Sequence, residues 1–226
     1  MSGSLPVLEA RNVRVFYNHG FLSPRRNYIT PPVSCSILAN EIVGLSGPSG
    51  CGKTSLGKAL LGLSPAWEGD IFWRGNNIRR MSLRRLRPFY GWIGQEPTMA
   101  FNPQRKIFDA LLETLKVNGR SDGGRQRIFK MCDQLNLERE LMFRHPFEMS
   151  PGQIQRCSLI RVFMLEPRFV LLDEPTSSLD PVNQTQLYEY IFSWRRVHGL
   201  AILLISHSSA FLSRICQKII SLEEDE

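Results

Sequence analysis

The chain has 226 residues, of which 42% are hydrophobic and 22% charged, a balance typical of globular rather than disordered proteins. Its 28 basic and 21 acidic side chains give a net charge of +7, which suits anionic partners without identifying one. No apolar run approaches the roughly 20 residues that span a bilayer, no secretory signal is visible, and the five cysteines match no zinc site, so we expect a soluble chain with reduced thiols in the cytosol.

The first forty residues predict an antiparallel edge layer, because residues 7–16 alternate like a strand and Pro31 and Pro32 mark a turn. Three later apolar runs, at residues 42–45, 169–172 and 201–205, are typical of buried parallel strands. Apolar residues at helical spacing lie between them, at 56–63, 107–115 and 128–135. This alternation predicts an α/β fold around a parallel sheet.

The middle of the chain has a different pattern. Residues from about 97 to 155 show helical spacing and loops but no convincing strand, and a glycine-rich linker interrupts them at 118–124. We therefore expect a helical subdomain inserted into the α/β core, with residues 1–226 forming a single domain.

Residues 47–54 (GPSGCGKT) fit the phosphate-loop pattern G-x-x-x-x-G-K-[ST], between a predicted strand and a predicted helix. The glycines let the backbone wrap a phosphate, and the N-terminus of the following helix adds positive potential. Lys53 is placed to reach the β- and γ-phosphates, and the Thr54 hydroxyl to bind Mg²⁺. The alternative is a glycine-rich turn that binds nothing, which the strand, the helix and the lysine together disfavour.

Two acids end the predicted strand at 169–172. Asp173 is placed to hold Mg²⁺, and Glu174 to orient or deprotonate an attacking water. Acids at the end of a buried strand are costly without a partner or a role, although the pair could also simply begin a turn. Since ligands of open α/β sheets lie at the carboxyl ends of the strands, the nearby phosphate loop favours a catalytic pair.

Two further polar residues follow apolar stretches. His207 comes shortly after the predicted strand at 201–205, where it would contact the γ-phosphate, although a lone histidine is often only a surface or core residue. Gln95 follows the stretch at 90–94 and could complete the surroundings of Mg²⁺ and water.

The order of these motifs resembles the nucleotide-binding subunit of ATP-binding cassette (ABC) transporters. The phosphate loop, Gln95, residues 149–153 (MSPGQ), residues 171–180 (LLDEPTSSLD) and His207 follow one another as they do in that family. The resemblance implies a P-loop ATPase that hydrolyses ATP with Mg²⁺ between two subunits arranged head to tail. The segment MSPGQ looks like the family signature LSGGQ, which completes the site on the partner subunit.

The resemblance also implies roles for single residues. Tyr17 would stack on adenine, with Phe16 on the opposite face of the strand as the alternative, and Asp180 of the D-loop would lie at the subunit contact. The implied catalytic residues are Glu174, His207 and Gln95, and the implied Mg²⁺ ligands are Thr54, Gln95 and Asp173. The implied ATP-binding residues are Gly47, Pro48, Ser49, Gly50, Cys51, Gly52, Lys53, Thr54 and Ser55, with Ser150, Gly152 and Gln153 of the signature facing the partner's ATP.

A narrower resemblance rests on residues 101–103 (FNP), 17–21 (YNHGF), 71–75 (IFWRG) and 153–157 (QIQRC), which are similar to the oligopeptide, dipeptide and nickel importer branch, most of all to an ATPase subunit of nickel importers. It implies a subunit that lies at the cytoplasmic face of the membrane and energises the import of nickel, other metal complexes or oligopeptides. The implied partners are a second, different ATPase subunit, making a heterodimer, two membrane permeases and an extracytoplasmic solute-binding protein.

The alternative function is a soluble ABC ATPase that acts on nucleic acid or ribosomes. The arginine-rich run at 78–87 could be offered as a nucleic-acid patch. It lacks interleaved aromatic residues, so we interpret it as a solvated or subunit-facing surface and expect no nucleic-acid partner.

Pro151 departs from the family, because it stands where the signature has its first glycine. Ser150 is a good N-cap and Gln153 completes an S-x-x-Q capping box, which places Pro151 at the first helical position. We therefore expect a helix to begin here and the proline not to break it.

Overall fold

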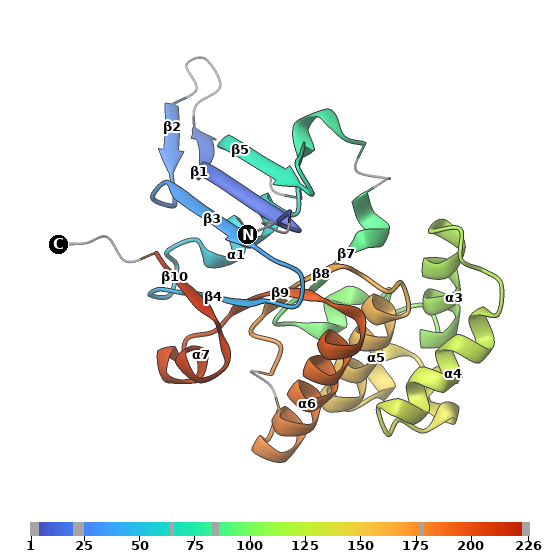
Figure 1. Cartoon of the computed structure of the whole chain (residues 1–226). Coiled ribbons are helices and arrows are strands. Elements are labelled where there is room, and N and C mark those ends of the chain that lie inside the picture. Colours follow the sequence, from blue (N-terminus) through green and yellow to red (C-terminus); the bar gives the residue numbers. More distant parts are fainter. Residues whose placement is uncertain (1–4, 20–24, 64–65, 83–85, 177–178, 223–226) are drawn as a thin grey trace.

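The computed structural model describes residues 5–19, 25–63, 66–82, 86–176 and 179–222. Two sheets and a set of helices build the fold, with an antiparallel sheet on one side of α1 and a parallel sheet on the other (Figure 1). The α/β class predicted from the sequence is confirmed, including the antiparallel layer and the inserted helices.

The core sheet is parallel throughout and has the strand order β10-β4-β9-β8-β7. Its strands are β4 (Ile42–Ser46), β7 (Tyr90–Ile93), β8 (Phe169–Asp173), β9 (Ala201–Ile205) and β10 (Lys218–Ser221). The three predicted apolar runs are the three inner strands, which are covered on both faces and therefore apolar throughout. The two edge strands are not predicted by the pattern, because β7 is partly exposed and β10 is largely so.

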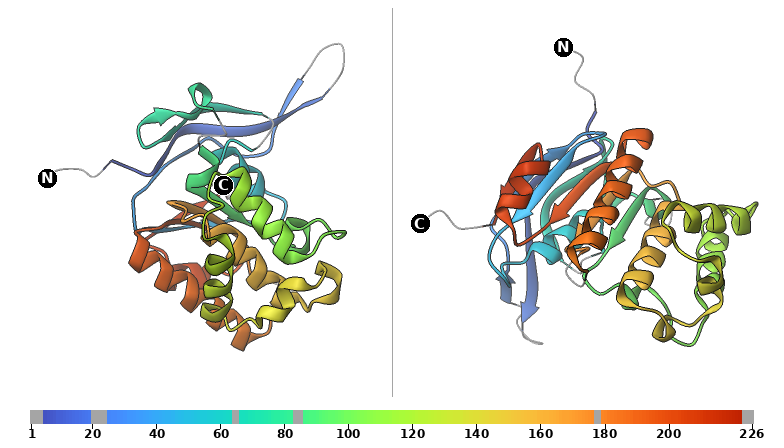
Figure 2. Two further views of the ribbon diagram at one scale, coloured as in Figure 1. Left: turned by 90° about the vertical axis from the view of Figure 1, so that its right-hand side faces the viewer. Right: turned by 90° about the horizontal axis from the view of Figure 1, so that it is seen from below.

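The antiparallel sheet is built around one long strand, β1 (Leu8–His19). This strand pairs with β2 (Arg25–Tyr28), β3 (Val33–Ile37) and β5 (Trp67–Trp73), and β6 (Asn76–Asn77) pairs with β5. The left view of Figure 2 shows this layer lying across the top of the molecule, away from the lower helices.

Two hydrophobic cores lie on the two faces of the parallel sheet. On one face, α1 (Lys53–Leu60) is packed between the sheets, and its Leu56 lies in the same core as Leu203 of β9. On the other face, α5 (Pro151–Phe163), α6 (Pro181–His198) and α7 (Ser209–Ile215) pack against the neighbouring positions Ile202 and Leu204. Successive residues of β9 thus point into opposite cores, as the period of a strand requires.

The inserted helices lie to one side of the sheet, as the right view of Figure 2 shows. They are α3 (Ile107–Val117) and α4 (Gly124–Gln134), followed by α5. Short 3₁₀ helices join the elements: η1 (Ile78–Arg80), η2 (Arg87–Phe89), η3 (Pro97–Ala100), η4 (Arg139–Phe143) and η5 (Pro146–Glu148). Within the described ranges, no helix combines the length and apolarity that crossing a bilayer takes.

The inserted helices come closest to the core sheet where α5 crosses β7. A Cβ at Gly91 would lie 2.2 Å from Cγ1 of Val162, so the glycine is what allows this approach. The contact holds α5 against β7, the edge strand that ends shortly before Gln95.

All five cysteines are free, as the sequence predicts. Burial raises the pKa of Cys35, Cys132 and Cys216 to about 11, so these thiols stay protonated at neutral pH.

Candidate active site

The predicted site segments meet at the carboxyl edge of the core sheet. In β4 and β9, Leu45 pairs with Ile205, and in β8, Asp173 pairs with the same Ile205. Ile93, at the end of β7, pairs with the residue before Asp173. The parallel register therefore gathers the phosphate loop, Glu174, His207 and Gln95 along one edge, although they are far apart in the chain.

The phosphate loop depends on glycines with positive φ. Gly47, Gly50 and Gly52 have φ values of 147°, 80° and 94°. At Gly52 the space is also closed, because a Cβ there would lie 2.7 Å from Cγ2 of Thr30. These conformations curl the chain into a tight loop immediately before α1. The residues at its apex, Pro48, Ser49 and Gly50, are exposed.

Lys53 is the first residue of α1 and folds back across the loop. Its side chain is buried, and Nζ donates to the carbonyl oxygens of Gly47 at 2.8 Å and Pro48 at 2.7 Å. No described side chain caps the start of α1, so its first amides are available to an anion. The ammonium group and the helix N-terminus together give this loop the positive potential and free donors that a bound phosphate would require.

Asp173 and Thr54 come together across two elements. Thr54 donates a side-chain hydrogen bond to Asp173, which is buried. Burial raises the pKa of the Asp173 carboxyl, while the Thr54 hydrogen bond and the positive charges of Lys58 and Lys53 oppose that shift. The approach depends on Gly57, where a Cβ would lie 2.8 Å from Cδ2 of Leu171. The helix α1 thus lies directly on β8.

Glu174 has a left-handed backbone and an imidazole beside its carboxylate. Its φ is 48°, and its amide donates to the carbonyl of Ile205 at 3.2 Å. Oε1 of Glu174 lies 2.5 Å from Nε2 of His207. The glutamate side chain is 14% exposed and the histidine 55%, so the acid is held inside the edge while the imidazole faces outward.

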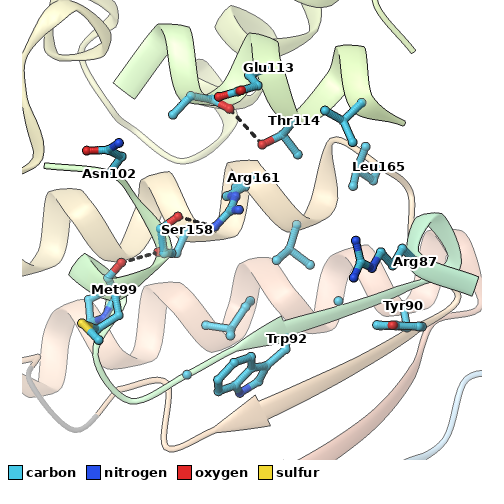
Figure 3. A pocket seen from close by; sticks show the side chains of 18 of the residues that line it. Arg87, Tyr90, Trp92, Met99, Asn102, Glu113, Thr114, Ser158, Arg161 and Leu165 are labelled. Atoms are coloured by element: carbon cyan, nitrogen blue, oxygen red, sulfur yellow. Dashed lines mark hydrogen bonds between the residues drawn. The ribbon is translucent and has the colours of Figure 1, made fainter. Parts of the chain in front are cut away.

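Gln95 is exposed, lies after the end of β7 and is one of the residues that line a groove of about 1050 Å³. Figure 3 shows this groove from close by. The groove runs between β7 and the helices α3 and α5. Its lining combines apolar side chains with arginines, among them Trp92, Met99, Val117, Arg87 and Arg161. Gln95 therefore belongs both to the edge with the acids and to a large groove.

Of the two aromatic candidates in β1, Tyr17 is exposed and Phe16 is buried. Phe16 packs edge-on against Tyr28, with ring centroids 5.7 Å apart. Tyr17 pairs with Asn27 of β2 and keeps 48% of its surface exposed. Only Tyr17 of this pair offers a ring face to a base.

The segment 149–153 forms the helix start expected from its sequence. Ser150 is the N-cap of α5, its Oγ accepts from the amide of Gln153 at 3.3 Å, and Gln153 Oε1 accepts from the amide of Ser150 at 2.9 Å. Pro151 occupies the first helical position. The capping box predicted from the sequence is confirmed, and the proline leaves the helix intact.

Asp180 caps the next helix in the same manner. Its Oδ1 accepts from the amides of Val182 and Asn183, each at 3.1 Å, at the start of α6. The hydrogen bond from the Asn183 side chain, together with these two amide bonds, lowers the pKa of the Asp180 carboxyl. The residue is exposed, as a subunit contact requires, but it also has a role within its own chain.

A profile described as ABC transporter matches residues 31–177, which include the phosphate loop, Gln95, the signature segment and both acids. The chain belongs to the ABC transporter family. The matched residues are the same ones that the fold gathers at the sheet edge and at the start of α5.

Curated ABC proteins similar to this chain are named for peptide and nickel import. Oligopeptide transport ATP-binding protein OppF of Haemophilus influenzae is 31% identical, covering 88% of this chain and 62% of OppF. A putative peptide import ATP-binding protein of Brucella ovis is 34% identical over 96% of this chain and 69% of its own length. Nickel import ATP-binding protein NikE of Escherichia coli O157:H7 is 27% identical over 98% and 85%. The chain thus spans about two thirds of the length of the first two.

Solved ABC cassettes share the fold. The cassette MJ0796, in a dimer bound to ADP and Pi, has a TM-score of 0.84 and 22% identity, covering 96% of this chain and 94% of the cassette. An ATP-binding subunit of an ABC transporter has a TM-score of 0.80 and 24% identity, covering 96% and 86%.

The sequence does not predict two glutamine side chains that hydrogen-bond to backbone carbonyls of residues following Glu174. Gln155 of α5 is buried and donates to the carbonyl of Pro175 at 2.6 Å, and Gln184 of α6 donates to the carbonyls of Thr176 and Leu179. The available signal is a glutamine among buried apolar positions of α5, which requires a partner without naming it.

Proposed function

We propose that this chain is the ATP-binding and hydrolysing subunit of a bacterial ABC importer for peptides or nickel complexes. The observation that carries the proposal is the meeting of phosphate loop, Asp173, Glu174 and His207 at one edge of the sheet. Membership of the family and the names of its relatives support the importer type.

The chemistry proposed is attack of water on the γ-phosphorus of ATP. The phosphate-loop amides and Lys53 hold the phosphates, and Glu174 accepts the proton of the attacking water as the bond between the γ-phosphorus and the ADP oxygen breaks. His207 lies against the Glu174 carboxylate, where it orients the base and can donate toward the γ-phosphate. The products are ADP and phosphate, whose charges repel between the two subunits.

The residues at the edge also fit Mg²⁺. Thr54 and Asp173 already form an oxygen pair, and the amide of Gln95 supplies another hard oxygen at the same edge. Burial makes the ionised Asp173 costly, which a divalent cation would offset. When bound, Mg²⁺ neutralises charge on the phosphates, and these three residues would hold it.

A second ATPase subunit completes the proposed site. The Ser150 hydroxyl and the Gly152 amide lie at the exposed start of α5, where they can reach the ATP of a partner facing head to tail. We propose that this partner is a different ATPase chain, as the resemblance to the importer branch implies.

A permease helix is the proposed occupant of the groove in Figure 3. The groove exposes large apolar side chains, since Trp92 is 39% exposed, Val117 77% and Met99 82%. Apolar surface of this kind marks a contact with another protein. The chain would then work at the cytoplasmic face of the membrane, attached to two permeases that receive solute from a solute-binding protein.

The proposal is tested by purifying the chain with its partner ATPase and permeases and measuring ATP turnover in liposomes. We expect turnover to require the complete assembly and to rise with a solute-loaded binding protein. An oligopeptide and a nickel complex, added separately, distinguish the two solute classes. Full, concentration-independent turnover by the dilute chain alone would contradict the two-subunit site.

A further inference from the structure

One helix contacts both catalytic loops through a row of polar side chains. Gln155, Ser158 and Arg161 lie three residues apart in α5, so they share one face of the helix. Gln155 donates to the carbonyl of Pro175, the residue after Glu174. Further along, Ser158 donates to the carbonyl of Pro97 at 3.3 Å and Arg161 to that of Ala100, both in the segment that follows Gln95 (Figure 3).

The bond from Gln155 is buried and reaches the residue directly after Glu174. Gln155 is 1% exposed, and Nε2 lies 2.6 Å from the Pro175 oxygen. Glu174 itself has a φ of 48°, a conformation that residues other than glycine keep only where the surroundings hold it. Its amide is held by β9 through the carbonyl of Ile205, and the carbonyl of the following residue, Pro175, is held by Gln155.

A second glutamine, on another helix, holds residues that follow Pro175. Nε2 of Gln184, in α6, donates to the carbonyls of Thr176 at 3.1 Å and Leu179 at 2.9 Å. Pro175 is therefore held by α5, which begins directly after Ser150 of the signature, while Thr176 and Leu179 are held by α6.

We infer that Gln155 is a positioning residue for Glu174, and that α5 thereby joins the placement of the general base to the placement of the signature in the same subunit. The inference rests on the proposed ATPase function. A shift of α5 on contact with the partner's ATP would be transmitted through the buried bond from Gln155 to the carbonyl of Pro175, the residue after Glu174. Each subunit would thus sense the other's nucleotide at its own base.

The deciding variant is Gln155→Met, which keeps the volume of the side chain and removes its donor. We expect kcat of the assembled transporter to fall about 10- to 100-fold, the effect of a misplaced catalytic group. The KM for ATP should stay within about twofold, because the phosphate loop is untouched. A matched control is Arg127→Met, which removes a bond to the carbonyl of Met164 at the other end of α5 and should leave kcat unchanged.

A double-mutant cycle separates positioning from general destabilisation. If Gln155 acts through the base, adding Gln155→Met to Glu174→Gln should change the residual single-turnover rate by less than about twofold. Effects that multiply, or an equal loss in Arg127→Met, would overturn the inference. Where Gln155→Met does not fold, Gln184→Met serves in the same cycle, since it releases the same segment from the partly exposed α6.

The wild-type assembly distinguishes failure of this inference from failure of the proposed function. Wild-type turnover that Glu174→Gln abolishes and Gln155→Met leaves intact would overturn the inference alone. A wild-type assembly without ATP turnover would overturn the proposed function, and the inference with it.

Discussion

The phosphate loop and the signature segment are both helix starts, yet they are built in opposite ways. At the phosphate loop, glycines with positive φ lead into α1, and no described side chain takes up the first amides of the helix. At the signature, Ser150 and Gln153 satisfy each other's amides in a capping box, and Pro151 has no amide to offer. The first arrangement leaves several donors for a ligand, whereas the second leaves the Gly152 amide and the Ser150 hydroxyl hydrogen.

The difference indicates which half of the proposed two-subunit site contributes most of the binding energy. A phosphate-loop half with free amides and a buried lysine is organised to hold phosphate by itself. A capped helix start is rigid and presents few donors, so its contribution depends on being brought to a ligand already bound elsewhere.

The largest effect should come from Glu174→Gln. The amide keeps the shape of the side chain and loses the proton acceptor, so hydrolysis by the assembled transporter should fall roughly 10²–10⁴-fold. ATP binding should persist and the ATP-bound dimer should accumulate on size-exclusion chromatography. Near-normal turnover would show that Glu174 is not the general base.

Lys53→Ala should weaken ATP binding about 10- to 100-fold, the loss of charge-assisted hydrogen bonds to phosphate. A fluorescent nucleotide titration measures it. Lys130→Ala is the matched control, since it removes an exposed lysine from α4, among the inserted helices. An affinity equal to wild type in Lys53→Ala would argue that the loop binds no nucleotide.

Tyr17→Ala should weaken ATP binding by about 1–3 kcal/mol if the exposed ring stacks on adenine. Phe16→Ala is the comparison, and it should instead lower the melting temperature because Phe16 is buried against Tyr28. The same titration with ATP and with inorganic triphosphate separates base contacts from phosphate contacts. Loss of affinity in Phe16→Ala alone would place the base on the other face of β1.

The smallest effect is expected at the signature. Pro151→Gly should change maximal turnover by less than about fivefold, because the proline sits where a helix needs no amide. Gly152→Asp should be far worse, since it puts a charge where the partner's phosphates come. A rise of about tenfold or more in Pro151→Gly would show that the natural signature is built to bind ATP without promoting its cleavage.

The parts of the fold that could be predicted are those whose cause is local. The inner strands are buried on both faces, so their apolar runs are enough to predict them. The capping box at Ser150 involves only four consecutive residues, so it can be predicted from the local sequence. The start of α1 is predicted three residues late, at Leu56 instead of Lys53, because apolar spacing cannot register the polar first turn. The edge strand β10 has little burial and therefore little pattern.

The site divides in the same way. Motif spacing could predict Lys53, Asp173 and Glu174, since each belongs to a segment with its own chemistry. The contact between Glu174 and His207 follows only from the register of β8 and β9, and the bond from Gln155 to Pro175 joins residues 20 positions apart. Such contacts depend on how helices pack on the sheet, which short patterns do not encode.

The close approach of Gly91 to Val162 gives α5 a point of contact with the core sheet about which the helix can rotate. The contact lies near the C-terminal end of the helix, where Val162 packs directly against the backbone of β7. From Val162 to Pro151 the helix runs about 16 Å at its usual rise per residue. Rotation of the inserted helices by about 10° around this pivot would therefore carry the signature end roughly 3 Å, while the end beside β7 barely moves. The position of this single glycine at the sheet edge thus determines how far the signature moves when α5 rotates about its contact with β7.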